Sequence, residues 1–467
     1  LVDVTKAFGT NISIAAAAIA EDYFGHAPGQ IELAATLMAL YGAPMYFYKK
    51  AKGVFKAAPE ETLKQALAAI ERKKQQDAQI EAWAAELQQG GLPAEISADL
   101  KTILHAPDKQ TLTYKAFTKA ADAMKLSPLA LAQQSGGVAS IPQYLRDGFE
   151  MKYFPRGIAF ADLPVPVLAD LPRAEVEAFS IDDDATTEVD DALSLTDLAG
   201  GGKRVGIHIA APALAIAPGS DMEKTIAERQ STVYFPGDKI TMLPENWIAA
   251  FSLDAGGYRP AVSIYFDVDA DFNVSAPVCK IEAVNIVENL RIQAIEPHFN
   301  AQSGLDAEGA ALFAHHRDLI WFYQLAIARQ KARGKYEPER AAQYDYSIEL
   351  ASDGLVSVAR RERGSPIDTL VSEMMILANS TWAQMLDQVG LPGLFRVQPA
   401  GKVRMSTQSE PHIGMGVQHY GWFTSPLRRA ADYINQKQLI SLIDPQAAPL
   451  YQKNDADLFA ALRDFDT

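Results

Sequence analysis

"SIDDDATTEVDDALSL", residues 180–195, is the stretch on which the interpretation of the whole chain depends. Six of the ten residues from Asp182 to Asp191 are carboxylates, and none of the ten is Lys or Arg. Like charges this close repel one another, and unpaired acids are costly to bury. Because apolar residues flank the run on both sides, the sequence predicts a turn at the rim of a core rather than a floppy tail.

The composition of this acidic run leaves two interpretations open. A divalent cation would supply the missing positive charge, and hard oxygen ligands favour Mg²⁺ or Mn²⁺. The alternative is a solvated acidic turn, as most charge runs are. A calcium loop of the EF-hand type is excluded, because counting from Asp182 puts Thr187 where that loop needs Gly and Leu193 where it needs Glu.

The overall composition is that of an ordinary globular protein and argues against several protein classes. The chain has 467 residues, 48% of them hydrophobic and 22% charged. No apolar run approaches the roughly 20 residues of a membrane helix, so the sequence predicts a cytoplasmic protein without a membrane partner. Cys279 is the only cysteine, which leaves it no disulfide partner within the chain. The net charge of −15 opposes a whole-surface attraction to nucleic acid but permits a local basic groove.

The first third of the sequence has a helical pattern. Residues 28–135 show helical periodicity with start and stop signals. "YKAFTKAADAMKLSPLALAQQSGG", residues 114–137, predicts a helix, a Ser-Pro break and a second helix. This pair suits an RNA-binding helix-turn-helix, although two packed helices without a partner are the more common explanation. Residues 44–59 predict a hairpin, whose four lysines form either an RNA-facing patch or a plain solvated surface.

The pattern changes after a proline-rich stretch at 155–172. Strand-like segments follow, together with two helices at 366–389 and about 425–443. We therefore predict an α+β fold, in which an antiparallel sheet with helices follows a mainly helical, winged-helix-like N-terminal domain. The predicted divisions are an N-terminal domain at 1–140, a linker or extended boundary at 141–172, a mixed domain at 173–445 and a C-terminal segment at 446–467.

A basic counterpart to the acidic run lies in "HYGWFTSPLRRAADYINQKQLISLI", residues 419–443. Ser425, followed by proline, predicts the N-cap of a helix. Arg428 and Arg429 would then fall in the first turn, where cations oppose the helix dipole and a phosphate would resolve the conflict. The alternative pairs Arg428 with Asp432 and leaves Arg429 exposed to solvent.

These motifs together resemble the ribonuclease II/R exoribonucleases. Their catalytic signature is an Asp, five residues, another Asp, one residue, and an Asp-Asp followed by Ala-Leu. The similarity continues in the family's order through "GIHIAAPALAIAPGS", "STVYFPGDKITMLPE", "FSLDAGG", "VSEMMILAN", "GLFRVQ" and "MSTQSEPHIGMGVQHYGWFTSPLRRAADYINQKQL". The resemblance implies an RNB-type catalytic domain with Mg²⁺-dependent 3′-to-5′ hydrolytic exoribonuclease activity. It also implies that the chain acts as a monomer and releases nucleoside 5′-monophosphates from the 3′ ends of single-stranded RNA.

The resemblance assigns roles residue by residue. One or two Mg²⁺ ions, or Mn²⁺ in their place, would be held by four carboxylates that also count as catalytic: Asp182, Glu188, Asp190 and Asp191. Arg428 would be the catalytic arginine that clamps the scissile phosphate. The residues expected to contact the RNA are Tyr234, which would stack near the 3′ end, together with Ser425, Arg428 and Arg429.

Three features depart from the family pattern. Position 188 is Glu where the family usually has Asp. Ala211 replaces another usual Asp, while the neighbouring His208 fits a structural role better than a catalytic one. The helical N-terminal part stands where family members usually carry small RNA-binding barrels, and a C-terminal S1-type barrel would begin near or beyond Thr467. The first two departures favour an alternative, a non-catalytic RNA-binding homologue with a degenerate metal site. A nuclease acting mainly on DNA is a third possibility.

Overall fold

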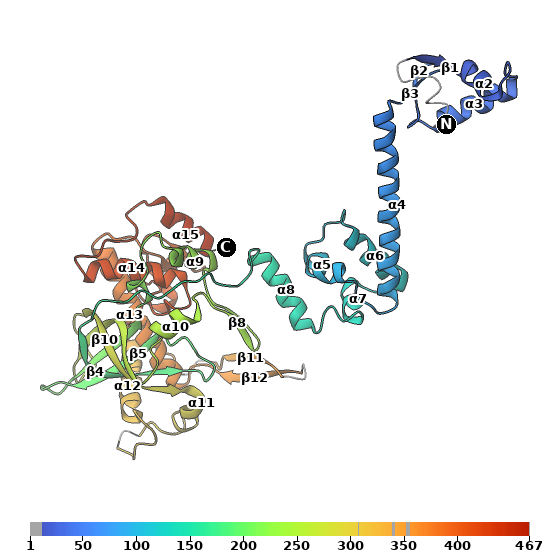
Figure 1. The fold of residues 1–467 in the computed structure, drawn as a ribbon. Coiled ribbons are helices and arrows are strands. Elements are labelled where there is room, and N and C mark those ends of the chain that lie inside the picture. The colour runs from blue at the N-terminus through green and yellow to red at the C-terminus, as the bar shows by residue number, and fades with distance from the viewer. Residues whose placement is uncertain (1–11, 307, 339–340, 352–354, 467) are drawn as a thin grey trace. The chain divides into compact units, whose positions relative to one another are not determined.

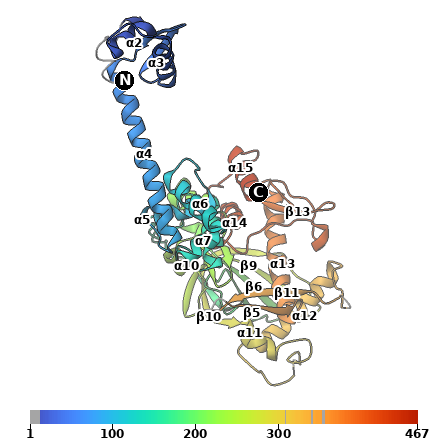
Figure 2. The same cartoon turned by 90° about the vertical axis from the view of Figure 1, so that its right-hand side faces the viewer.

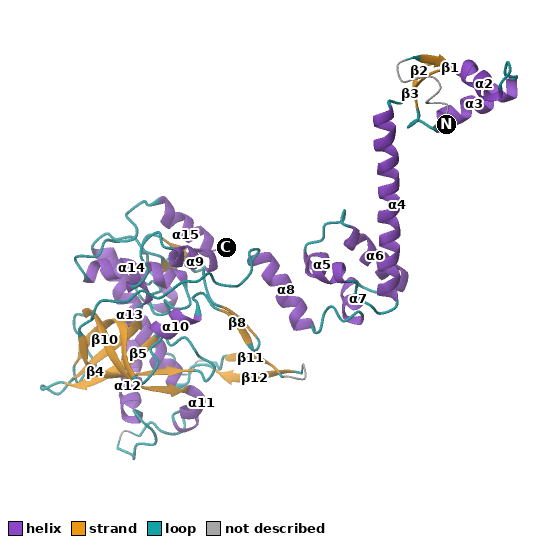
Figure 3. Ribbon diagram, viewed as in Figure 1, coloured by secondary structure: helices purple, strands orange, loops and turns teal. Residues whose placement is uncertain are grey.

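The computed structural model of the chain describes residues 12–306, 308–338, 341–351 and 355–466. It separates into two compact units, Leu1–Ile158 and Ala159–Thr467. Figure 1 traces the chain through both units. Figure 3 shows that the first is mainly helical, whereas most of the strands gather in the second. The fold class predicted from the sequence is therefore confirmed.

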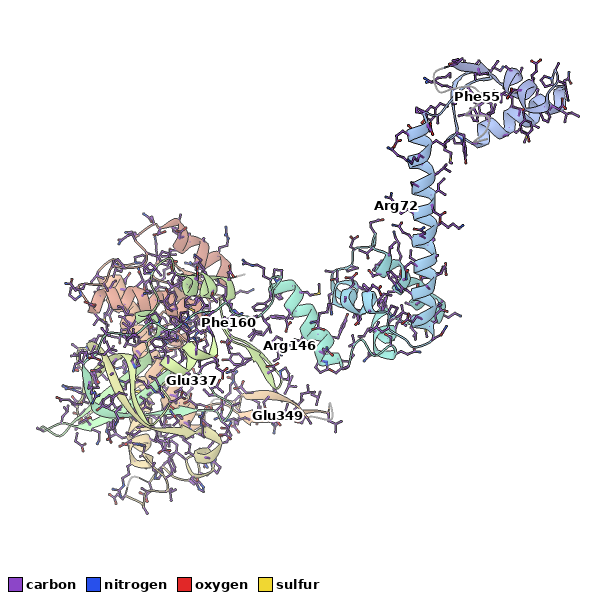
Figure 4. The ribbon with its side chains drawn as sticks, viewed as in Figure 1. Phe55, Arg72, Arg146, Phe160, Glu337 and Glu349 are labelled. Carbon is purple, nitrogen blue, oxygen red and sulfur yellow. The ribbon has the colours of Figure 1, made fainter. Side chains whose placement is uncertain are left out.

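The N-terminal unit begins with a small module of three strands and two helices. Its elements are β1 (Ser13–Ala15), α2 (Ala16–Phe24), α3 (Gln30–Gly42), β2 (Phe47–Ala51) and β3 (Val54–Ala57), with the antiparallel strand order β1-β3-β2. Leu40, Phe47 and Phe55 fill its core, and Phe55 is labelled in Figure 4. The hairpin predicted for 44–59 is confirmed. The elements follow the order strand, helix, helix and hairpin, and the winged-helix likeness of the N-terminal domain stays a prediction.

Helices make up the rest of this unit. They are α4 (Glu60–Gln88), α5 (Ala94–His105), α6 (Leu112–Met124), α7 (Pro128–Gln134) and α8 (Ile141–Tyr153). Phe117 and Leu131 bury one face of α6 and of α7 in a common core. The Ser127 hydroxyl accepts a hydrogen bond from the Ala130 N–H at 3.1 Å, and proline follows at the first helical position. The predicted helix, Ser-Pro break and helix are confirmed, while their RNA-binding role stays a prediction.

The segment predicted as a linker, residues 141–172, consists of two consecutive parts with different secondary structure. Its first part is helix α8, which the sequence interpretation missed although Ser140 caps it and proline lies in its first turn. Residues 154–172 form neither helix nor strand. The Phe160 ring, which is labelled in Figure 4, lies 3.7 Å from the Arg229 guanidinium, and both residues belong to the second unit.

A closed five-stranded barrel forms the centre of the second unit. Its strands are β4 (Arg173–Asp182), β5 (Asp191–Asp197), β6 (Lys203–Ala210), β9 (Gly257–Val268) and β10 (Val278–Arg291), in the order β10-β4-β5-β6-β9. The pairs β4–β5, β5–β6, β6–β9 and β9–β10 are antiparallel, as predicted. The pair β4–β10 is parallel. This pair closes the barrel and leaves no open sheet edge.

The other elements are inserted between the barrel strands or follow them. The helices are α9 (Asp221–Arg229), α10 (Glu245–Phe251), α11 (Ile292–Ile295), α12 (His316–Ala332), α13 (Pro366–Gln388), α14 (Ala430–Ile443) and α15 (Ala456–Asp466). The hairpins pair β7 (Val233–Phe235) with β8 (Asp238–Ile240), β11 (Tyr344–Leu350) with β12 (Val356–Glu362), and β13 (Phe395–Val397) with β14 (Arg404–Ser406). Figure 2 shows α12 and α13 beside the barrel strands, and Leu325, Trp382 and Leu439 join one core with them. None of the helices in the described ranges is both long and apolar enough to cross a membrane.

A buried polar cluster lies within this barrel. His208 on β6 is fully buried, with its ring nitrogens 2.8 Å from the hydroxyls of Ser194 on β5 and Ser263 on β9. A Cβ added to Gly206 would lie 2.7 Å from the His208 ring, so glycine makes room for it. Burial lowers the pKa of His208 to about 3, which keeps the ring neutral. The geometry supports the structural role predicted for this histidine.

The neutral state of His208 predicts a specific loss of stability in acid. In the unfolded chain a histidine titrates near 6.5, so between pH 6.5 and 3 the unfolded state binds the extra proton and stability falls with falling pH. The free energy of unfolding should therefore drop between pH 7 and pH 5 by about 2 kcal/mol more in the wild type than in His208→Gln. Denaturant unfolding at both pH values measures this, with the exposed His26→Gln as control. Parallel pH profiles for the wild type and His208→Gln would contradict the assignment.

Candidate active site

The carboxylates of the acidic stretch are brought together where two barrel strands meet. Asp182 is the last residue of β4 and Asp191 is the first of β5, and the two strands are paired through Phe179 and Leu193. The residues between them form a loop at one end of the barrel. The Asp190 carbonyl is fixed there, since it accepts a hydrogen bond of 2.8 Å from the N–H of Ala210 at the end of β6.

Asp190 links this loop to Arg428, which lies far away in the sequence. One carboxylate oxygen of Asp190 accepts from the backbone N–H of Leu427, and the other accepts from Arg428 Nε, both at 2.9 Å. The Asp190 side chain is only 2% exposed, whereas that of Arg428 is 39% exposed. Burial raises the pKa of Asp190 to about 7 even with the arginine beside it. Asp190 thus holds Arg428 by one edge and leaves the guanidinium partly open to a ligand.

Asp182 and Asp191 place two further carboxyl groups close to Asp190, and the pKa of each is raised. Burial, and after it the charges of Asp182 and Asp190, raise the pKa of Asp191 to about 8. Burial also raises the pKa of Asp182, although the Ser180 hydroxyl donates to this carboxylate at 2.6 Å. Such shifts are expected where buried carboxylates lie close together. The structure therefore brings Asp182, Asp190, Asp191 and Arg428 together.

The turn that carries Arg428 differs from the predicted helix start. Helix α14 begins at Ala430 with Arg429 as its N-cap, so Ser425 is not the cap. Arg429 is extended because it forms a β-bridge with Ser231, and the Ala430 N–H donates to the Gln230 carbonyl at 2.7 Å. This tertiary pairing overrides the local Ser-Pro signal. Ser425 is instead buried, and its hydroxyl accepts a hydrogen bond of 2.8 Å from Arg428 Nη2.

The alternative interpretation, in which Arg429 is exposed to solvent and Arg428 pairs with Asp432, does not describe the structure. Its guanidinium forms an ion pair with the fully buried Asp432 at 2.7 Å and lies 4.5 Å from the Trp422 ring. Asp432 therefore pairs with Arg429 rather than with Arg428, and Arg429 is not a solvent-exposed side chain. These contacts fix the start of α14 directly behind the turn that presents Arg428.

Two residues of the candidate site lie at the hairpin β7–β8. Tyr234 on β7 is 59% exposed, which excludes a core position, and its phenol lies close enough to the Arg428 guanidinium for the two groups to affect each other's pKa. Glu188 is buried, and its carboxylate contacts Lys239 on β8 and Thr232 just before β7. Within the loop, Asp183 and Asp184 are exposed.

Comparison with known proteins identifies the domain that carries this site. The sequence profile of the RNB domain family matches residues 172–405 and 400–445. The chain belongs to the RNB family. This match begins one residue before β4 and ends after α14, so the RNB domain contains the whole barrel and every site residue named above. The family predicted from the sequence motifs is thereby confirmed.

The proteins similar to this chain include exoribonucleases and a pseudonuclease. Exoribonuclease 2 of Glaesserella parasuis serovar 5 is 26% identical over 339 residues, which are 58% of this chain and 51% of that protein. The chain thus spans about half the length of this curated relative. The fold resembles an active-site mutant of the Dss1 exoribonuclease from Candida glabrata, with a TM-score of 0.66 over 93% of this chain and 65% of that one, at 15% identity. It also resembles the pseudonuclease Ssd1 of yeast, with a TM-score of 0.51 over 64% of this chain and 44% of that one, at 15% identity.

The donor set of the RNB site fits a hard divalent cation. Among the described residues, no three His, Cys, Asp or Glu side chains already surround one point as the ligands of a closed metal cage would. Mg²⁺ does not need such a cage, because it commonly takes one or two carboxylates and keeps water and substrate phosphate oxygens for its other positions. Asp182 and Asp191 meet that requirement, and burial raises the pKa of each carboxyl group despite the arginines nearby.

Sequence reasoning missed three residues that shape the RNB site. Arg291, the last residue of β10, lies opposite Asp182 in the β4–β10 register and donates to the Asp183 carbonyl at 3.0 Å. Lys239 and Thr232 both bond to Glu188. The only signal for Lys239 and Thr232 was that both lie in "STVYFPGDKITMLPE", a stretch that resembles the family, and nothing in the sequence indicated Arg291.

Proposed function

We propose that the chain is a Mg²⁺-dependent 3′-to-5′ exoribonuclease that hydrolyses single-stranded RNA to nucleoside 5′-monophosphates. The observation that carries this proposal is the meeting of Asp182, Asp190 and Asp191 with Arg428 at one end of the barrel of an RNB domain. A carboxylate cluster beside an arginine is the arrangement that phosphodiester hydrolysis requires, since one group of residues can hold a cation and the other a phosphate. The name of the relative, Exoribonuclease 2, supports the same reaction.

Each residue has a distinct task in this proposal. Asp182 and Asp191 would hold the divalent ion, and Asp190 would complete the set through its remaining lone pairs. The ion would supply Lewis-acid activation of the attacking water and of the scissile phosphate. Arg428, held at one edge by Asp190, would direct its free N–H groups at a nonbridging phosphate oxygen and balance the charge that develops there. No Ser, Cys or His nucleophile is required.

The exposed ring of Tyr234 is the proposed platform for a base near the 3′ end. Base stacking on an aromatic ring is worth about 1–3 kcal/mol and tolerates any sequence, which suits an enzyme that removes every nucleotide in turn. Because Tyr234 contacts Arg428, a base stacked on it would lie next to the phosphate clamp. The cytoplasmic location, the monomeric state and the RNA contacts of Ser425 and Arg429 stay predictions.

Two observations support a different candidate function, that of a non-catalytic RNA-binding protein. Glu188 is already neutralised by Lys239 in the structure. The fold also resembles a pseudonuclease as well as exoribonucleases. The intact Asp182, Asp190, Asp191 and Arg428 oppose this alternative, because a protein that only binds RNA does not need buried carboxylates close to the bound phosphates.

One assay separates the proposed function from its alternatives. The full chain is incubated with a 3′-tailed RNA and with the matching DNA, in Mg²⁺ and in EDTA, and the products are resolved by mass. We expect nucleoside 5′-monophosphates from RNA in Mg²⁺ only, and none from the Asp190→Asn variant. Comparable release from DNA would identify a DNA nuclease. RNA binding without Mg²⁺-dependent release would identify the non-catalytic homologue.

A further inference from the structure

A single buried carboxylate holds both strands of the hairpin β7–β8. Glu188 Oε1 accepts a hydrogen bond of 3.2 Å from the Thr232 hydroxyl, next to the first strand. Glu188 Oε2 accepts from Lys239 Nζ, on the second strand. The Glu188 side chain is 3% exposed and that of Lys239 is 24% exposed, so water has little access to the ion pair. This Glu188–Lys239 clasp thus ties the acidic loop of the barrel to a hairpin that follows some fifty residues later.

The clasp holds the part of the hairpin that carries Tyr234. Lys239 and Tyr234 are direct partners in the β7–β8 register. Thr232 extends the connection, because its N–H donates to the Arg428 carbonyl at 3.0 Å and its hydroxyl accepts from the Met242 N–H at 3.1 Å. Glu188, Tyr234 and Arg428 are therefore linked through one short stretch of hairpin. A change in the clasp would shift the aromatic ring relative to the guanidinium.

The contacts of Glu188 conflict with a direct metal role. An ammonium group at hydrogen-bonding distance already supplies the charge that a cation would otherwise bring to this carboxylate. A divalent ion bound to the same oxygens would face that ammonium at close range, which is strongly repulsive. Among the described residues, no lysine or arginine forms an ion pair with Asp182 or Asp191, whereas Glu188 has Lys239 and Asp190 has Arg428.

The length of the side chain at position 188 also matches this arrangement. Glu reaches one C–C bond farther than Asp, about 1.5 Å. That reach allows its two oxygens to contact Thr232 and Lys239 on the two sides of the hairpin. The departure from the family's usual Asp thus coincides with a lysine placed to receive the longer carboxylate.

We infer that Glu188 is a positioning residue, which acts through Lys239 and Thr232 to fix Tyr234 beside Arg428, and that it does not bind the metal ion. The effect of the clasp on RNA rests on the proposed function. The clasp itself does not, because it is a property of the folded chain. It predicts that a substitution at either end loosens the same hairpin, and that the second substitution adds little to the first.

Hydrogen exchange in EDTA tests the clasp without metal or RNA. In Glu188→Gln and in Lys239→Met, the amides of 233–240 should exchange roughly tenfold faster than in the wild type, and in the double variant no faster than in either single one. Glu188→Asp should also speed exchange, because the shorter side chain cannot keep both contacts. Arg204→Met, which breaks the exposed Arg204–Asp267 pair on the same barrel, is the matched control and should leave the hairpin unchanged. Unchanged exchange in both clasp variants would overturn the inference.

Mn²⁺ titration followed by electron paramagnetic resonance tests the second half of the inference. The dissociation constant for Mn²⁺ should change by less than about threefold in Glu188→Gln, while Asp191→Asn should weaken binding by roughly 10²-fold or more. If Glu188→Gln weakens Mn²⁺ binding as strongly as Asp191→Asn does, Glu188 is a metal ligand and the inference is wrong.

The effect on RNA separates this inference from the proposed function. Lys239→Met should raise the KM for single-stranded RNA roughly tenfold, as loss of a stacking contact does, with a smaller change in kcat. An unchanged KM together with faster hairpin exchange would mean that Tyr234 is positioned but does not bind RNA. A wild-type chain that degrades no RNA would overturn the proposed function, while the exchange and Mn²⁺ results would still decide whether the clasp exists.

Discussion

Replacing Asp191 by Asn is expected to abolish nuclease activity while making the metal-free protein more stable. Activity on single-stranded RNA should fall by at least about 10³-fold, because a ligand of the catalytic ion contributes several kcal/mol to transition-state stabilisation. Stability in EDTA at pH 7 should rise by at least about 1 kcal/mol. The reason is that burial and neighbouring carboxylates raise the pKa of Asp191 to about 8, so folding opposes its charge, and Asn removes that cost.

A general folding defect would lower both activity and stability, so a loss of activity together with a gain of stability separates the predicted effect from such a defect. Activity is followed by mononucleotide release in Mg²⁺, and stability by denaturant unfolding in EDTA. Asp183→Asn is the matched control, since it removes a carboxylate from the exposed part of the same loop. That variant should keep its activity within about twofold and its stability within about 0.5 kcal/mol. An Asp191→Asn protein that is less stable than the wild type in EDTA would show that the carboxylate has a structural partner rather than a cation site.

Replacing Arg428 by Lys should reduce kcat by about 10²–10³-fold with little change in stability. Arg428 uses Nε to bind Asp190 and Nη2 to bind Ser425, and its remaining N–H groups are available to a phosphate. A lysine keeps the positive charge that the buried Asp190 requires, but its single ammonium cannot serve the protein and the phosphate in the same geometry. The loss should therefore appear at the transition state, as it does when one oxyanion donor is removed.

Steady-state kinetics and thermal unfolding distinguish this effect from a folding defect. Arg428→Lys should unfold near the wild-type temperature and bind single-stranded RNA with a similar dissociation constant. Arg363→Lys, at the exposed ion pair with Asp345, is the control for a conservative arginine replacement and should leave kcat unchanged. If Arg428→Lys retained the full kcat, positive charge alone would be enough and the proposed clamp would be wrong.

Local patterns in the sequence predicted the parts of the fold that depend on neighbours along the chain. The Ser127 cap, the break before α7, the hairpin at 44–59 and helix α13 each follow from turn chemistry or helical periodicity, and the structure contains all of them. Helix α14 shows the limit of this reasoning. Ser425 followed by proline has the signature of a helix start, yet residues 426–428 form only a turn, and pairing with Ser231 holds Arg429 extended, so the helix begins at Ala430.

The site was predictable as a set of residues but not as a set of contacts. The resemblance to the ribonuclease II/R family singled out Asp182, Asp190 and Asp191, and the structure brings them together because they lie on one loop between paired strands and at the ends of those strands. The partners across the fold were not predictable. Arg428 could not be paired with Asp190 from the sequence, and Glu188 could not be paired with Lys239, since barrel closure and hairpin packing create both contacts. The parallel register of β4 and β10, which places Arg291 beside Asp182, also could not be predicted, because barrel closure creates it.

The most direct test of the account is to locate the cation. A crystal of the full chain grown with Mn²⁺ is measured at a wavelength where manganese scatters anomalously. The account predicts an anomalous peak within bonding distance of Asp182 and Asp191, on the side that faces Arg428, with Glu188 still bonded to Lys239. A peak bound to Glu188 with Lys239 displaced, or no peak near these carboxylates at saturating Mn²⁺, would contradict it.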